Sequence, residues 1–390
     1  MKKNNNKFET NAIRTQLKRT ENLEHSVPLY LTSSFVFEDA EDMRASFAEE
    51  KDRNIYSRYS NPNSSEFIEK VCQMEGAESG FAFASGMAAV FSTLAALLDS
   101  GDHVLSARSI FGSTHSLFTN FFPKWNIDHT YFKIDALEEI ESLITPKTKI
   151  IYAETPTNPG VDVLDLEELG KIAKRNNLIL IIDNCFASPY LQQPIKFGAD
   201  LVIHSGTKLM DGQGRVLAGI TVGSSALMDK VYRFSRITGP ALSPFNAWVL
   251  SKSLETLAIR VDRHCENALK LAEFLEGHEN INWVKYPFLK SHPKYEIAKK
   301  QMKAGGCVVA FEVKGGLDAG REFFDSIKLL SLSANLGDSR TIVTHPASTT
   351  HSKLSVEERA AVGISDGTVR ISVGLEHIDD IIADITQALG

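Results

Sequence analysis

Two ionisable residues, Asp183 and Lys208, each follow an apolar stretch of the chain and lie 25 positions apart. A lysine acts as a nucleophile or base near pH 7 only when its environment lowers its pKa from about 10.4. Beside this lysine, the hydroxyls of Ser205 and Thr207 could donate hydrogen bonds to a phosphate. This is the local chemistry of a lysine that binds a phosphate-bearing cofactor as a Schiff base. A carboxylate such as Asp183 could keep a pyridine nitrogen of that cofactor protonated.

A third candidate, Ser85-Gly86-Met87, lies where a short strand is expected to meet the start of a helix. The free backbone N–H groups of a helix start and its dipole favour an anion such as phosphate. Each candidate alone also fits a structural role: a turn at Gly86, a loop cap at Asp183, and a surface lysine at Lys208. Their combination indicates a cofactor site more strongly than any one of them.

Two other enzyme classes share parts of these motifs. Residues 205–208 match the S-x-x-K pattern of penicillin-binding serine enzymes, but residues 291–294 match it too, and the chain has no S-D-N or K-T-G motif. Gly212-Gln213-Gly214 resembles part of a dinucleotide loop, but the next glycine, Gly219, falls two positions late. Both alternatives are therefore weaker than the cofactor hypothesis, as is a non-catalytic protein that retains only the fold.

The candidates require strands and helices that alternate along the chain. Apolar stretches predict strands at 80–83, 103–106, 149–153, 178–182, 199–203 and 219–222. This alternation predicts an α/β fold with a mostly parallel sheet. Ligands bind at the carboxyl ends of such strands, which is where Asp183 and Lys208 are placed.

We expect three parts: an N-terminal arm at 1–60, a large cofactor-binding domain at 61–255 and a smaller C-terminal α/β domain at 256–390. A long helix is expected around 251–275 at the second boundary. Asn63 and Glu66 form a plausible capping box that would begin a helix at about Ser64. The arm itself could wrap a partner subunit or form a surface loop.

Composition excludes several classes of function. A net charge of −7 argues against nucleic-acid binding. The longest apolar helix candidate, 88–98, is too short to cross a membrane, and no apolar segment follows the basic start as in a signal peptide. The four cysteines are widely spaced without a CxxC pair, so we expect no metal site, reduced thiols and a cytoplasmic protein. Cys185, close to Asp183, is a minor candidate for a reactive thiol.

The motifs at 85–87, 154–159, 182–184 and 204–208 resemble, in order and spacing, those of the Cys/Met-metabolism enzymes that use pyridoxal 5'-phosphate. That family includes cystathionine γ-synthase, methionine γ-lyase and the O-acylhomoserine sulfhydrylases. The resemblance covers residues 30 to about 377. It implies an aspartate-aminotransferase-like fold (fold type I) and a homotetramer built from two tight dimers.

The resemblance also implies roles for individual residues. Lys208 would hold pyridoxal phosphate as a Schiff base and move protons, while Asp183 would pair with the pyridinium nitrogen. The cofactor phosphate would be bound by Gly86, Met87, Ser205 and Thr207, and Tyr56 and Arg58 would reach the phosphate of a neighbouring subunit. Phe111 would stack on the cofactor ring, and Asn158 would lie near its phenolic oxygen. The substrate would be bound by Asn335 and Arg370. Arg370 would bind the substrate α-carboxylate as a bidentate pair.

Two departures narrow the expected activity. Phe111 replaces the tyrosine that stacks on the cofactor in many members, so its hydroxyl is lost. Asn335-Leu336-Gly337 replaces a Ser-Leu-Gly motif, and the segments 211–215 and 335–351 look like those of the sulfhydrylases. The expected reaction is the replacement of succinate in O-succinyl-L-homoserine by sulfide. O-acetylhomoserine sulfhydrylase, cystathionine γ-synthase and methionine γ-lyase activities remain alternatives.

Overall fold

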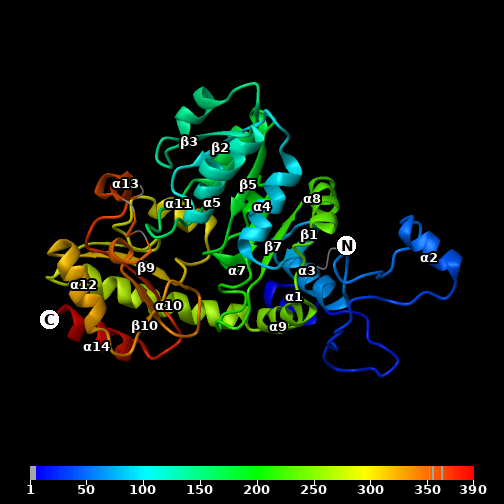
Figure 1. The fold of residues 1–390 in the computed structure, drawn as a ribbon. Coiled ribbons are helices and arrows are strands. Elements are labelled where there is room, and N and C mark those ends of the chain that lie inside the picture. Colours follow the sequence, from blue (N-terminus) through cyan, green and yellow to red (C-terminus); the bar gives the residue numbers. More distant parts are fainter. Residues whose placement is uncertain (1–5, 351, 354, 362) are drawn as a thin grey trace.

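A twisted sheet forms the centre of the computed structural model, which describes residues 6–350, 352–353, 355–361 and 363–390 (Figure 1). Within these residues the sheet has seven strands, and β7 runs antiparallel to both of its neighbours while the others run parallel. The strands follow one another across the sheet as β1 (Ser79–Phe83), β7 (Gly219–Gly223), β6 (Leu201–Ser205), β5 (Ile179–Asp183), β4 (Thr148–Glu154), β2 (His103–Ala107) and β3 (Asp128–Phe132). The expectation of a mostly parallel α/β sheet is confirmed.

The central strands are buried because their sequences are apolar on both faces, as parallel sheets require. The carboxyl ends of β4, β5 and β6 meet at one edge of the sheet, where Glu154, Asp183 and Ser205 end their strands. The sheet therefore brings together side chains that are far apart in the sequence.

Helices pack against the sheet and against one another. The helices are α1 (Phe8–Arg14), α2 (Ala40–Phe47), α3 (Pro62–Glu75), α4 (Gly86–Leu97), α5 (Gly112–Ser116), α6 (Leu166–Arg175), α7 (Ser188–Leu191), α8 (Ser225–Thr238), α9 (Pro244–Leu254), α10 (Leu257–Glu276), α11 (Tyr295–Gln301), α12 (Gly316–Ser326), α13 (Val356–Ala361) and α14 (Ile378–Leu389). Helix α4 contacts β6, β7 and α8, and α3 contacts β1, β7 and α9. The segment with α2 extends away from the rest of the chain (Figure 1).

The expected capping box was wrong, because helix α3 begins two residues earlier than predicted. Helix α3 is capped by Asn61, whose side chain accepts the Asn63 N–H at 2.9 Å, and Pro62 occupies its first turn. Asn63 instead accepts the Tyr30 N–H, and Glu66 accepts the Leu17 N–H. These two side chains bind the N-terminal arm and do not cap the helix.

The long helix expected around 251–275 is present as α10, but it begins only at Leu257, because a separate helix, α9, ends at Leu254. The Thr256 hydroxyl donates to the Ser253 carbonyl, and the Arg260 guanidinium donates to the same carbonyl. Side-chain hydrogen bonds of this kind compete with the helical backbone pattern.

A second, five-stranded sheet lies toward the C-terminus, with strands in the order β10 (Ser331–Leu332), β11 (Ile342–Thr344), β12 (Thr368–Ser372), β9 (Val308–Val313) and β8 (Ile281–Lys285). It packs against α10, α12 and α14 around its own hydrophobic core. The larger core surrounds the seven-stranded sheet. In the described part of the chain, none of the helices combines the length and apolar character needed to cross a membrane.

Candidate active site

A cavity of about 620 Å³ opens at the carboxyl edge of the seven-stranded sheet. Nine of the predicted site residues line it: Gly86, Met87, Phe111, Asn158, Asp183, Ser205, Thr207, Lys208 and Arg370. Its size lies within the range of small-molecule sites. The cavity joins residues from the large sheet with Arg370 from β12 of the C-terminal sheet.

Lys208 follows β6 by three residues and extends into this cavity. Its Nζ donates a hydrogen bond to Asn335 Oδ1 at 2.6 Å. Burial, and to a smaller extent the nearby Arg370 charge, lower the pKa of Lys208. A lowered pKa makes the neutral amine more available, and only that form can act as a nucleophile or base.

Asp183 ends β5 and is buried, with 8% of its surface exposed. Its Oδ1 accepts the Cys185 N–H at 3.1 Å, and its Oδ2 lies 3.4 Å from the Tyr152 hydroxyl. Burial raises the pKa of Asp183, and among the described residues its contacts include no ion pair. A buried carboxylate of this kind is stabilised by a cationic partner, such as a protonated ring nitrogen.

Another part of the cavity lining is suited to an anion. Helix α4 begins at Gly86, and its N-cap Ser85 accepts the Ala88 N–H, while the Gly86 and Met87 N–H groups have no intrahelical carbonyl to donate to. Gly86 approaches β6 so closely that a Cβ at this position would lie 2.9 Å from Ser205 Cβ. Ser205 and Thr207 add hydroxyls to the same lining. A helix start with neighbouring hydroxyls fits a phosphate group.

Arg370 is 5% exposed, and the described residues provide it with no carboxylate partner. Its Nη1 donates to Asn158 Oδ1 at 2.9 Å and its Nη2 donates to the Asn335 carbonyl at 3.0 Å. Its buried Nε has no hydrogen-bond partner. Burial lowers the pKa of Arg370 to about 10, so the guanidinium is still charged at pH 7. A buried guanidinium without a carboxylate partner suits a substrate carboxylate.

Glu154 is a site residue that the sequence analysis did not select. It ends β4 beside Asp183 in the strand register, and its Oε2 accepts the Phe111 N–H at 2.7 Å. The backbone N–H of Asn158 also donates to it. Burial and the adjacent Asp183 raise the pKa of Glu154 well above its ordinary value. The rule that selected Asp183, an ionisable residue at the carboxyl end of a buried strand, would also have selected Glu154.

Of three further residues of the sequence analysis, Cys185 lines the cavity, whereas Tyr56 and Arg58 do not. All four cysteines are free, and Cys185 lines the cavity with its Sγ 2.7 Å from the Ser205 nitrogen. Burial raises the pKa of the Cys185 thiol well above its ordinary value, which argues against a reactive thiolate.

Tyr56 and Arg58 lie outside the lining of this cavity, and the Arg58 guanidinium is placed over the ring of Tyr59.

Three features of the site suit pyridoxal phosphate. They are a buried lysine with a lowered pKa, a buried carboxylate without a cationic partner, and an anion site at the start of α4. Phe111, 43% exposed at the cavity, offers a ring face to an aromatic ligand. The fold and this site define an enzyme of the aspartate-aminotransferase-like class that depends on pyridoxal phosphate.

Comparison with known proteins agrees with this class. The sequence profile of the Cys/Met metabolism PLP-dependent enzymes matches residues 9–390, and the chain belongs to that family. It is 46% identical to the O-succinylhomoserine sulfhydrylase of Pseudomonas aeruginosa, over 98% of this chain and 95% of that protein. It is 43% identical to an L-methionine gamma-lyase of Fusobacterium nucleatum, over 93% of each chain.

A solved structure described as an O-acetylhomoserine (thiol)-lyase of Campylobacter jejuni superimposes with a TM-score of 0.93 and 36% sequence identity. The match covers 98% of this chain and 99% of that one. That protein carries a pyridoxyl-lysine phosphate.

Proposed function

We propose that this protein catalyses a γ-replacement in methionine biosynthesis, in which O-succinyl-L-homoserine and sulfide give L-homocysteine and succinate. The observation that carries the proposal is the 46% identity to an O-succinylhomoserine sulfhydrylase over nearly the whole chain. The cavity supports it because it provides a lysine, a ring-nitrogen partner and a carboxylate site within one space.

Binding of the cofactor would use two groups of residues in the cavity lining. The backbone N–H groups of Gly86 and Met87 and the hydroxyls of Ser205 and Thr207 would hold the phosphate. Asp183 would keep the ring nitrogen protonated. The bound cofactor supplies an electron sink for charge that develops at the substrate Cα.

The protein residues around the substrate have separate tasks. Arg370 would bind the α-carboxylate, and Asn335 would orient both Lys208 and Arg370, which it already contacts. Lys208 would hold the cofactor and, as a neutral amine, take the proton from the substrate Cα. Phe111 would stack on the cofactor ring. Because Phe111 has no hydroxyl, proton transfers assigned to a tyrosine elsewhere in the family would fall to Lys208 or water.

A product assay tests the proposal. The purified protein loaded with pyridoxal phosphate is given O-succinyl-L-homoserine with and without sulfide, and homocysteine and 2-oxobutyrate are quantified. We expect homocysteine to dominate whenever sulfide is present. If 2-oxobutyrate and ammonia dominate regardless of sulfide, the enzyme is a γ-lyase, as the second group of relatives is named. O-acetyl-L-homoserine, offered in parallel, measures the acyl preference.

Replacement of Arg370 by lysine should raise KM for the amino-acid substrate by about 100-fold, with a smaller fall in kcat. Lysine retains the charge but cannot form the bidentate pair, and its shorter reach disrupts the bonds to Asn158 and Asn335. Steady-state kinetics measure both constants. Arg321→Lys, an exposed substitution of the same type on α12, is the control. An unchanged KM in the Arg370 variant would exclude a role in carboxylate binding.

The assembly, the domain division and the location extend the proposal. We propose a homotetramer of two tight dimers, in which Tyr56 and Arg58 reach the cofactor phosphate of a neighbouring subunit. The exposure of Leu31 and Val36 on the arm, at 68% and 87%, supports an arm covered by a partner. We propose domains at 61–255 and 256–390, with 1–60 as the arm; the second hydrophobic core, whose buried residues lie between 268 and 389, supports a separate C-terminal domain. The four free thiols support a cytoplasmic protein.

A further inference from the structure

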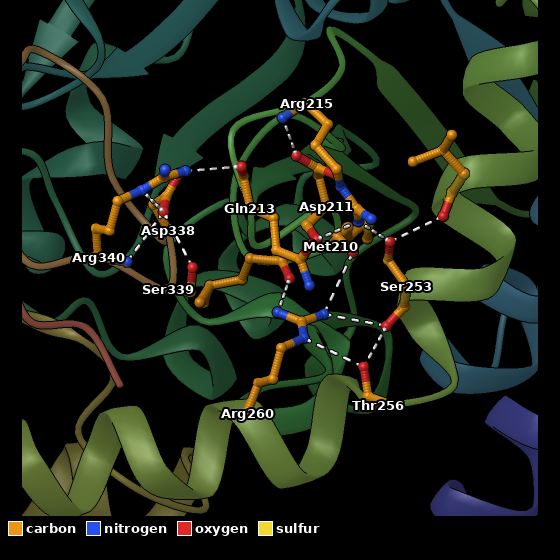
Figure 2. Close-up of polar contacts among 12 residues, drawn as sticks. Met210, Asp211, Gln213, Arg215, Ser253, Thr256, Arg260, Asp338, Ser339 and Arg340 are labelled. Carbon is orange, nitrogen blue, oxygen red and sulfur yellow. Dashed lines mark hydrogen bonds and ion pairs between the residues drawn. The ribbon is translucent and has the colours of Figure 1, made fainter. Parts of the chain in front are cut away.

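The loop that follows Lys208, residues 209–215, carries the Asp-Gly-Gln-Gly-Arg motif that the proposed site does not use. Figure 2 shows Arg260 pointing from α10 toward this loop, with Asp338 and Arg340 on another side of it. The loop closes on itself through the Asp211–Arg215 ion pair at 2.9 Å. It is therefore a compact unit between the large sheet and the C-terminal part of the chain.

Arg260 binds the loop through its backbone. It is 7% exposed, and its Nη1 donates to the Leu209 carbonyl at 2.8 Å, while its Nη2 lies 3.4 Å from the Met210 carbonyl. No acidic oxygen among the described residues forms an ion pair with it, and burial lowers its pKa to about 10. The Asp211 carboxylate acts on its charge at longer range, and the carbonyl groups accept charge-assisted hydrogen bonds from it. The two residues directly after Lys208 are held in this way.

The glycines of the motif are explained by the same contacts. A Cβ on Gly212 would lie 1.9 Å from Arg260 Nη1, and a Cβ on Gly214 would lie 2.6 Å from Asp338 Oδ2. Both glycines have positive φ, 69° and 66°, which other residues adopt only with strain. Each glycine therefore allows one neighbour to approach the loop backbone.

The other side of the loop is bound by the segment that also enters the cavity. The Ser339 N–H donates to the Gly212 carbonyl at 2.9 Å, and Arg340 Nη2 donates to the Gln213 carbonyl at 3.1 Å. A few residues earlier, Asn335 accepts the hydrogen bond from Lys208 Nζ. Lys208 is thus fixed at its backbone by the loop and at its amine by the segment that binds the loop.

We propose that Arg260 is a positioning residue for Lys208, which fixes the backbone after the lysine and so directs its amine into the cavity. The inference rests on the proposed role of Lys208 as the residue that holds the cofactor. A misplacement of about 1 Å at a reacting group can lower a rate by about 10²-fold. Arg260 would therefore affect the rate through the position of Lys208, without contacting the substrate itself.

The test is Arg260→Lys, which keeps the charge but loses the planar fork that spans two carbonyls. We expect kcat to fall by about 10- to 100-fold while KM changes by less than about threefold. The pH midpoint of the visible absorption change of the bound cofactor should shift by about half a unit or more, at unchanged cofactor content. Arg263→Lys is the matched control, because Arg263 lies on the same helix with 55% of its side chain exposed; it should change none of these.

A second variant keeps the proposal testable if Arg260→Lys folds poorly. Gly212→Ala leaves Arg260 in place but displaces its guanidinium, so it should shift the same midpoint and lower kcat. When Gly212→Ala is combined with Arg260→Lys, the additional fall in kcat should be smaller than the fall caused by Gly212→Ala alone, because both substitutions disrupt the same contact. The proposal is overturned if the variants lower only Tm and leave kcat and the midpoint as in the wild type. A failure of the proposed role of Lys208 gives a different result. In that case the Lys208→Ala variant would still carry covalently bound cofactor, independently of any substitution at Arg260.

Discussion

Replacement of Lys208 by alanine should lower kcat by at least about 10⁴-fold, the scale of losing a residue that takes part in covalent and proton-transfer steps. Among the described residues, Lys208 is the only lysine that lines the cavity, so no neighbouring amine can replace it. The variant therefore lacks the amine whose pKa is lowered in this cavity. Turnover of O-succinyl-L-homoserine with sulfide measures the effect.

A covalent assay separates this role from a loss of folding. Borohydride reduction followed by mass spectrometry of peptides should find the cofactor on the peptide with Lys208 in the wild type and on no peptide in the variant. Lys230→Ala, an exposed lysine on α8, serves as the control and should retain both activity and label. Full turnover in Lys208→Ala would exclude Lys208 as the catalytic lysine.

The second large effect is expected for Asp183→Asn, with kcat about 10³-fold lower, or about 4 kcal/mol of transition-state stabilisation. Asparagine has nearly the same shape, but it is neutral and cannot keep a ring nitrogen protonated. Burial raises the pKa of Asp183 in the protein alone, and a cationic partner would lower it again. The native carboxylate and the cofactor should therefore stabilise each other.

Kinetics and the rate of cofactor dissociation measure this variant. We expect faster dissociation together with the lower kcat. Asp200→Asn is a matched control, because Asp200 is also partly buried in the sheet, accepts the Leu180 N–H and has a pKa raised by burial, yet it lies outside the cavity. Equal losses in the two variants would indicate a structural role for Asp183.

Regular structure in the centre of the seven-stranded sheet could be predicted because it depends on local sequence. Strands β5 and β6 are continuous apolar stretches, and parallel strands that are buried on both faces have this composition. The edge strand β3 was missed because its residues are partly exposed and its sequence, Asp-His-Thr-Tyr-Phe, mixes polar and apolar side chains. The break between α9 and α10 was missed because apolar residues continue across it, with Leu254 on one side and Leu257 on the other.

For the site, the sequence by itself determined Lys208 and Asp183, because each is an ionisable residue at the end of a buried strand. It also indicated Gly86 and Met87, since a strand that leads into a helix leaves free N–H groups. Tertiary structure alone decided which other side chains face them. Glu154 binds the Phe111 loop, and Arg260 binds the loop after Lys208, through pairings whose partners are 43 and about 50 positions apart. Contacts over such separations follow from strand order and domain packing, which local composition does not encode.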